Sequence, residues 1–149
     1  MARVVVAIVV TFLWLGLGGC IDALDPDTGP AVAAACVDAD SDTGQAVSYG
    51  QNIQPIFNDR CRFCHFPDGV APIGLQVTGL NLSSYRTVLA GATAGPVIQA
   101  SRPCSSILFL KVSPGPPFGG RMPLNGPPFL TDGQIQLIHD WIAEGALAN

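Results

Sequence analysis

The chain has 149 residues, of which 12% are charged, with 17 glycines, 13 prolines and a net charge of −4. This length fits one small domain with accessory segments, and the glycine and proline content favours short helices and loops over long regular elements. Six of the eleven acidic residues lie before residue 47, so the remaining chain is nearly neutral and has no basic patch of the kind that binds nucleic acid.

The N-terminal residues have the pattern of a secretion signal. A short basic start precedes an apolar run over residues 4–17, which is shorter than the ~20 residues of a membrane-spanning helix. Residues 17–20, Leu-Gly-Gly-Cys, resemble a bacterial lipobox, in which the cysteine is lipidated. We predict a lipoprotein signal peptide over residues 1–19 and a lipid anchor at Cys20, with the protein facing the periplasm. Ile21 is more typical of the outer membrane, and cleavage without lipidation is the alternative.

Residues 20–46 show no helical or strand periodicity. They mix Asp, Ala, Thr, Gly and Pro, which predicts an acidic, flexible tether. Three alternating aspartates that begin at Asp38 resemble a calcium loop. However, the glycine and glutamate that an EF-hand has at positions six and twelve are replaced by Thr43 and Tyr49. A charged linker is therefore preferred over a calcium site.

From residue 47 the pattern becomes helical, and we predict a domain over residues 47–149. Ile53 and Phe57 recur at helical spacing, and Ser48 is suited to cap the helix that would run to Arg60. A turn at residues 66–69, Phe-Pro-Asp-Gly, is expected to end the next helix.

The second half of the domain alternates short helices with loops. Residues 70–82 are predicted as a loop, and short helices are predicted over 83–89 and 105–112. Residues 114–129 hold six prolines and four glycines in sixteen residues, and a stiff loop of this length is usually functional or disordered.

The last predicted element is an amphipathic helix opened by Thr131 as N-cap. Ile135, Ile138 and Ile142 share one of its faces and Trp141 flanks them.

The residues at 61–65 carry the most specific motif of the chain. Cys61 and Cys64 are separated by two residues and followed at once by His65, which is the attachment sequence for c-type haem. Each thiol would bond one haem vinyl group, and the imidazole would ligate the iron. A redox-active dithiol would open a helix after a strand, and no such pattern occurs. Zinc would need two further donors, for which only His139 and two other cysteines remain. One covalent haem c is the prediction.

The far side of the iron would need a second ligand. Once the signal is removed, the chain contains one methionine, Met122, and one histidine besides His65, namely His139. Met122 lies in the proline-rich loop, whose stiffness would hold a thioether in place at a low entropic cost. We predict Met122 as the axial partner of His65. His139 is expected to cap the edge of the core, and Lys111 or an open position are the minor alternatives.

Cys36 and Cys104 are left over once Cys20, Cys61 and Cys64 are assigned. In an oxidising compartment a disulfide is favoured over two free thiols, although spacing alone does not show that their Cβ atoms meet. Such a disulfide would pin the end of the tether to the domain.

Together these features resemble a class I, monohaem cytochrome c domain: Phe57 four residues before Cys61, the later Met122-Pro123 and the closing helix with Trp141. Three further segments resemble the planctomycete-type cytochrome c domains of bacterial envelope proteins: Leu80 to Tyr85, Pro114 to Pro123 and Ile138 to Ala146. The resemblance covers about residues 47–147. It implies an all-α fold whose first and last helices cross, with Gly50 and Phe57 meeting Trp141 and the haem in the resulting bowl.

Histidine and methionine together would leave the iron no open position for substrate. The sequence therefore predicts an electron carrier rather than an enzyme, exchanging electrons with redox partner proteins through small interfaces near the membrane. The alternative is a haem-based sensor, or the haem subunit of a larger oxidoreductase, with a labile sixth ligand. A module without haem also remains open if the two cysteines are never loaded.

Overall fold

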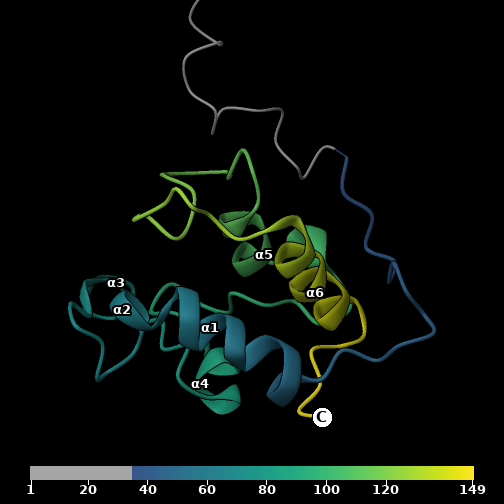
Figure 1. Cartoon of the computed structure of the whole chain (residues 1–149), viewed down its shortest axis with the longest axis horizontal. Helices are drawn as coiled ribbons and strands as arrows, with labels where there is room; N and C mark the ends of the chain where they lie inside the picture. The colour runs from purple at the N-terminus through teal and green to yellow at the C-terminus, as the bar shows by residue number, and fades with distance from the viewer. Residues whose placement is uncertain (1–34) are drawn as a thin grey trace, which may run out of the picture.

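The structure is a computed structural model that describes residues 35–149 (Figure 1). The predicted signal peptide, Cys20 and most of the predicted tether lie outside the described residues. In chain order the elements are η2 (Tyr49–Ile53), α1 (Gln54–Arg60), α2 (Arg62–His65), α3 (Ile73–Thr78), α4 (Tyr85–Ala90), η3 (Pro103–Ser105), α5 (Ile107–Val112) and α6 (Asp132–Ala143).

The predicted all-α class is confirmed for the part of the chain that the structure describes. Within residues 35–149 there is no strand, and the only β-pairing is one isolated bridge between Ala92 and Gly95. None of the helices in this range is long and apolar enough to cross a membrane.

The first helix starts as a π-helical turn, η2, and continues as α1. The Ser48 hydroxyl accepts a hydrogen bond from the Gln51 N–H at 3.2 Å, so the predicted N-cap is confirmed. Pro55 in the first turn of α1 has no N–H to donate to the Gln51 carbonyl, which interrupts the regular ladder and is compatible with the wider turn before it. Ile53 and Phe57 are fully buried, as their spacing predicted.

The last helix, α6, is capped as predicted. The Thr131 hydroxyl accepts from the Gln134 N–H at 3.2 Å, and the Gln134 side chain accepts from the Thr131 N–H at 3.0 Å. This reciprocal pair is a capping box, which satisfies two backbone donors that the helix leaves unpaired. Ile138 and Ile142 are fully buried on the predicted face.

The two ends of the domain meet where η2 contacts α6. The Tyr49 ring lies 5.4 Å from the Trp141 ring and 6.4 Å from the Phe57 ring, both measured between centroids. Gly50 was expected to meet Trp141, but it is exposed, and a Cβ built on it would have only the Asn149 carbonyl nearby, at 4.0 Å, so that expectation is wrong. Tyr49, the residue before it, packs against Trp141 instead.

Residues 70–82, predicted as a loop, contain the short helix α3. The helix follows Pro72, and the Thr78 hydroxyl donates to the Gly74 carbonyl at 2.6 Å before the chain turns at Gly79. Six residues are too few to establish a helical period in the sequence, which is why the prediction missed this element. The helices predicted at 83–89 and 105–112 are present as α4 and α5.

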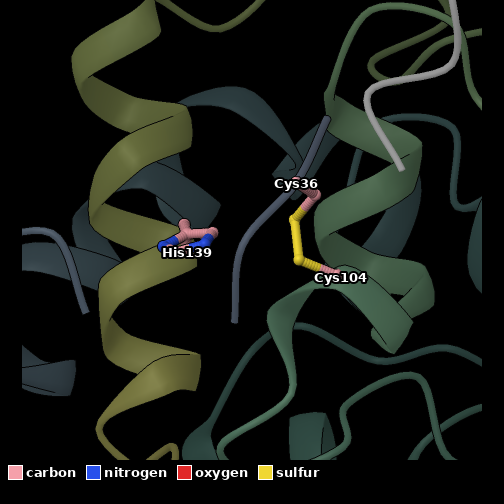
Figure 2. Close-up of side chains that lie close together, drawn as sticks. All are labelled: Cys36, Cys104 and His139. Carbon is pink, nitrogen blue, oxygen red and sulfur yellow. A yellow bond between two sulfur atoms is a disulfide. The ribbon is translucent and has the colours of Figure 1, made fainter. Parts of the chain in front are cut away.

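Cys36 and Cys104 form a disulfide with an S–S distance of 1.99 Å and a Cα–Cα distance of 5.7 Å. The Cys104 N–H also donates to the Asp38 carboxylate at 2.9 Å, which is a second link between residues 36–38 and η3. Figure 2 shows this disulfide beside α6, with His139 on the facing side of the helix. The disulfide therefore fastens residue 36 to the start of η3.

Residues 36–46 do not form the free tether that was predicted. The Val37 carbonyl lies 2.7 Å from His139 Nε2, and the Ser41 hydroxyl donates to the Asp140 carboxylate at 2.6 Å. The Val47 N–H donates to Glu144 at 2.8 Å. The sequence pattern indicated solvation because most of these residues are polar. In the structure most of them are exposed, but polar side chains of α6 accept hydrogen bonds from some of them or donate to others.

The carboxylate of Asp140 is the centre of this network. Burial raises its pKa, but hydrogen bonds from Ser41, His139 and Gln136 outweigh that effect and hold the pKa below its ordinary value. Because the folded pKa is depressed, the carboxylate stabilises the fold above the unfolded pKa, and this stabilisation is lost as the pH falls through the folded pKa.

Asp140→Asn is therefore expected to lower the free energy of unfolding by about 2–3 kcal/mol at pH 7 and by less near pH 3. Urea unfolding of both proteins at several pH values measures the difference. Asp59→Asn, which changes an exposed carboxylate of α1, is the matched control and should leave the pH dependence unchanged. An Asp140→Asn curve parallel to that of the parent at all pH values would show that the network carries no such stabilisation.

Candidate haem-attachment site

One helical turn, α2, presents the three residues of the attachment sequence. Cys61 ends α1 and begins α2, its N–H donates to the Phe57 carbonyl at 3.0 Å, and the His65 N–H donates to the Cys61 carbonyl at 2.9 Å. Residues three and four apart share one face of a helix, so Cys61, Cys64 and His65 lie on one side of this turn. Both cysteines are free thiols of intermediate exposure.

The His65 ring is oriented by the backbone. Its Nδ1 lies 3.2 Å from the Leu80 carbonyl, to which a protonated Nδ1 donates. This fixes the tautomer in which Nε2 keeps its lone pair, and histidines that ligate metals usually show the same arrangement. Burial lowers the pKa of His65, although the hydrogen bond to Leu80 acts in the opposite direction. The lowered pKa favours the neutral ring that a metal ion requires.

Gly74 of α3 makes a close approach to the same ring. A Cβ built on Gly74 would lie 2.7 Å from both Nε2 and Cε1 of His65, and 3.0 Å from the Cys64 carbonyl. Any other residue at this position would place a side chain in the space beside Nε2. Glycine at this position therefore lets the backbone of α3 approach the edge of the His65 ring that carries Nε2.

The surroundings of the Cys61 thiol disfavour its thiolate. Burial raises the pKa of Cys61 to about 12, whereas the nucleophilic cysteine of a redox-active dithiol has a lowered pKa. Within residues 35–149, one group of three or more possible metal donors is found, and it consists of Cys36, Cys104 and His139. Neither cysteine of the motif belongs to it. Among the described residues, Cys61 and Cys64 thus lack the further donors that a zinc site needs.

The loop with Met122 lies beside the end of α1 that carries Cys61. The Arg60 guanidinium donates to the backbone carbonyls of Pro128 and Phe129. A small cavity of about 130 Å³ lies between the two segments, lined by Asp59, Arg60, Pro123, Asn125 and Pro128. It is smaller than the ~300–1,000 Å³ of typical ligand pockets. Met122 itself is partly buried against the core.

No family model, curated protein or solved structure matches this chain. The assignment of the site therefore depends on its own residues and their geometry.

The structure accounts for the two residues weighed against Met122. His139 is buried, and its Nδ1 lies 2.9 Å from Asp140 while its Nε2 faces the Val37 carbonyl, so both ring nitrogens are engaged. The two cysteines nearest to it are joined to each other and offer no thiolate. The Lys111 ammonium donates to the backbone carbonyls of Phe118 and Gly120.

Two contributors to the site were not predicted from the sequence: the Leu80 carbonyl and Gly74. A backbone carbonyl leaves no signature in a sequence, and Gly74 falls in a segment whose helix was missed. Lys111, the chain's single lysine, was considered only as an alternative ligand, and its contacts with the proline-rich loop were not predicted.

Proposed function

We propose that this protein carries one haem c, bound covalently to Cys61 and Cys64, and passes single electrons in the bacterial cell envelope. The observation that carries the proposal is the orientation of His65: its Nδ1 is directed to the Leu80 carbonyl, which leaves Nε2 for iron, on the same helical turn as two free thiols. His65 and Met122 would be the axial ligands.

The bound haem would supply reversible one-electron chemistry at its iron. The chain's residues would hold and shield it. Cys61 and Cys64 would fix it by thioether bonds, the Leu80 carbonyl would keep the His65 ring in one orientation, and Met122 would close the other side. With both sides closed, the residues favour electron transfer over the binding of a substrate.

The exposed apolar side chains support this proposal. Phe63 of α2 and Ile73 and Val77 of α3 are 48%, 61% and 77% exposed, and Phe118 of the proline-rich loop is 58% exposed. Because α2 and α3 contact each other, Phe63, Ile73 and Val77 lie on neighbouring helices, and apolar side chains gathered in one patch usually mark a surface that contacts another apolar group. A flat apolar cofactor between α2, α3 and the loop would remove part of this surface from water.

The place of action follows from the predicted signal and lipid anchor at Cys20, and it is part of the proposal. A domain held at the membrane surface meets its redox partner proteins at a raised effective concentration, which suits the small, weak interfaces of electron transfer. An electron carrier of this kind needs no catalytic residue of its own.

The proposal is tested by expressing the full chain in a host with c-type haem maturation. The parent protein is expected to keep one haem on a denaturing gel and to gain the mass of one haem. Cys61→Ser/Cys64→Ser should lose it entirely. Cys36→Ser/Cys104→Ser is the matched control, since it also removes two sulfurs; it should keep the covalent haem although it is less stable. A colourless parent protein, or covalent haem on the Cys61/Cys64 double variant, would contradict the proposal.

A further inference from the structure

Lys111 lies at the end of α5, where the chain enters the loop that carries Met122. Its Nζ donates to the Phe118 carbonyl and to the Gly120 carbonyl, each at 2.6 Å. The same Nζ lies 4.9 Å from the centre of the Phe118 ring, in the geometry of a cation–π contact. One ammonium group thus contacts two carbonyls and one ring, which belong to Phe118 and Gly120.

The loop is shaped to receive this ammonium. Gly119 has a φ of +58°, the left-handed region that glycine adopts without strain, and the flanking carbonyls at 118 and 120 both reach Nζ. A Cβ on Gly119 would lie 3.6 Å from Nζ. The turn at 118–120 is therefore wrapped closely around the lysine.

The backbone of Lys111 contacts Met122 directly. The Met122 N–H donates to the Lys111 carbonyl at 2.7 Å, and in the next residue pair the Arg121 Nε donates to the Val112 carbonyl at 2.9 Å. The end of α5 and residues 121–122 therefore run side by side in a fixed register. The side chain of Lys111 closes the turn that leads into that register.

We propose that Lys111 is the positioning residue for Met122: by clamping the 118–120 turn, it fixes where the thioether sulfur is presented. This inference rests on the proposed function, because it concerns the axial ligand of the proposed haem. A loop of glycines and prolines has few apolar contacts to hold it, so the charge-assisted hydrogen bonds of one lysine take that role. Lys111 would act through Met122 and would not itself ligate the iron.

The test uses imidazole, which competes with methionine for ferric iron. In the haem-loaded full chain, Lys111→Gln is expected to bind added imidazole about tenfold more tightly than the parent, since the methionine is held less firmly. Lys111→Arg, whose guanidinium can also donate to two carbonyls, should restore the parent's affinity. Arg86→Gln removes an exposed cation of α4 and is the matched control, with no change expected.

A second readout does not depend on haem. In the haem-free chain, hydrogen exchange at the Met122 amide should speed up about tenfold in Lys111→Gln, while amides in the middle of α6 keep the parent's rate. A merely structural role would instead speed exchange throughout the domain and leave imidazole affinity unchanged.

The results distinguish the role of Lys111 from the proposed function on which it rests. A parent protein that has haem and methionine ligation, with unchanged imidazole affinity in Lys111→Gln, overturns the role of Lys111 alone. A parent protein without haem or without methionine ligation overturns the proposed ligand set and this role with it.

Discussion

Met122→Ala is expected to abolish the sulfur-to-ferric-iron absorption band of the haem-loaded protein and to lower its reduction potential by on the order of 0.1 V. The reason is that a thioether stabilises ferrous iron, and Met122 is the one methionine other than Met1. Optical spectra and a redox titration of both proteins measure the two effects.

His139→Ala is the control for Met122→Ala, because His139 is the histidine other than His65 in the described domain. It should keep the band, since both of its ring nitrogens already have partners within the fold. An unchanged spectrum in Met122→Ala would remove Met122 from the ligand set. Rapid binding of carbon monoxide by the ferrous parent protein would instead favour a sensor with a labile sixth ligand.

Trp141→Ala is expected to reduce the free energy of unfolding by about 3–5 kcal/mol, a large part of the ~5–15 kcal/mol that stabilises a typical domain. Trp141 is fully buried, its ring lies 5.4 Å from that of Tyr49, and its Nε1–H donates to the Leu147 carbonyl at 2.9 Å. The variant would leave a cavity where η2 meets α6. Urea unfolding followed by circular dichroism measures the loss.

Two further variants make the Trp141 prediction specific. Trp141→Phe keeps most of the packing and loses the indole hydrogen bond, so a cost of about 1–2 kcal/mol is expected. Leu89→Ala, at a side chain of α4 that is 42% exposed, should cost less than about 1 kcal/mol. Equal costs for Trp141→Ala and Leu89→Ala would show that the contact between η2 and α6 does not carry the stability of the domain.

The helices that could be predicted from the sequence are those with a cap and a period. Ser48 and Thr131 cap the first and last helices as expected, and Ile138 and Ile142 lie on the predicted buried face. These signals are local, because a cap and a helical period are properties of fewer than about fifteen consecutive residues. The motif at 61–65 is local for the same reason.

The features that were missed depend on residues far apart in the chain. Residues 36–46 looked solvated because their partners, His139 and Asp140, are about a hundred positions away. The same holds for Gly50, whose neighbour is Asn149. Propensity gives no information on such contacts, and only the folded chain shows that Tyr49 packs against Trp141.

The Cys36–Cys104 disulfide closes a covalent ring between two residues whose sequence separation is 68, and Cys61 and Cys64 lie inside that ring. Four thiols can pair in three ways, so maturation of this protein must avoid scrambled disulfides that use Cys61 or Cys64. Exchange requires a thiolate, and partial burial, which raises the pKa of Cys61 to about 12, disfavours its thiolate. Under the proposed function, the fold would thus slow mispairing of this thiol before haem is attached.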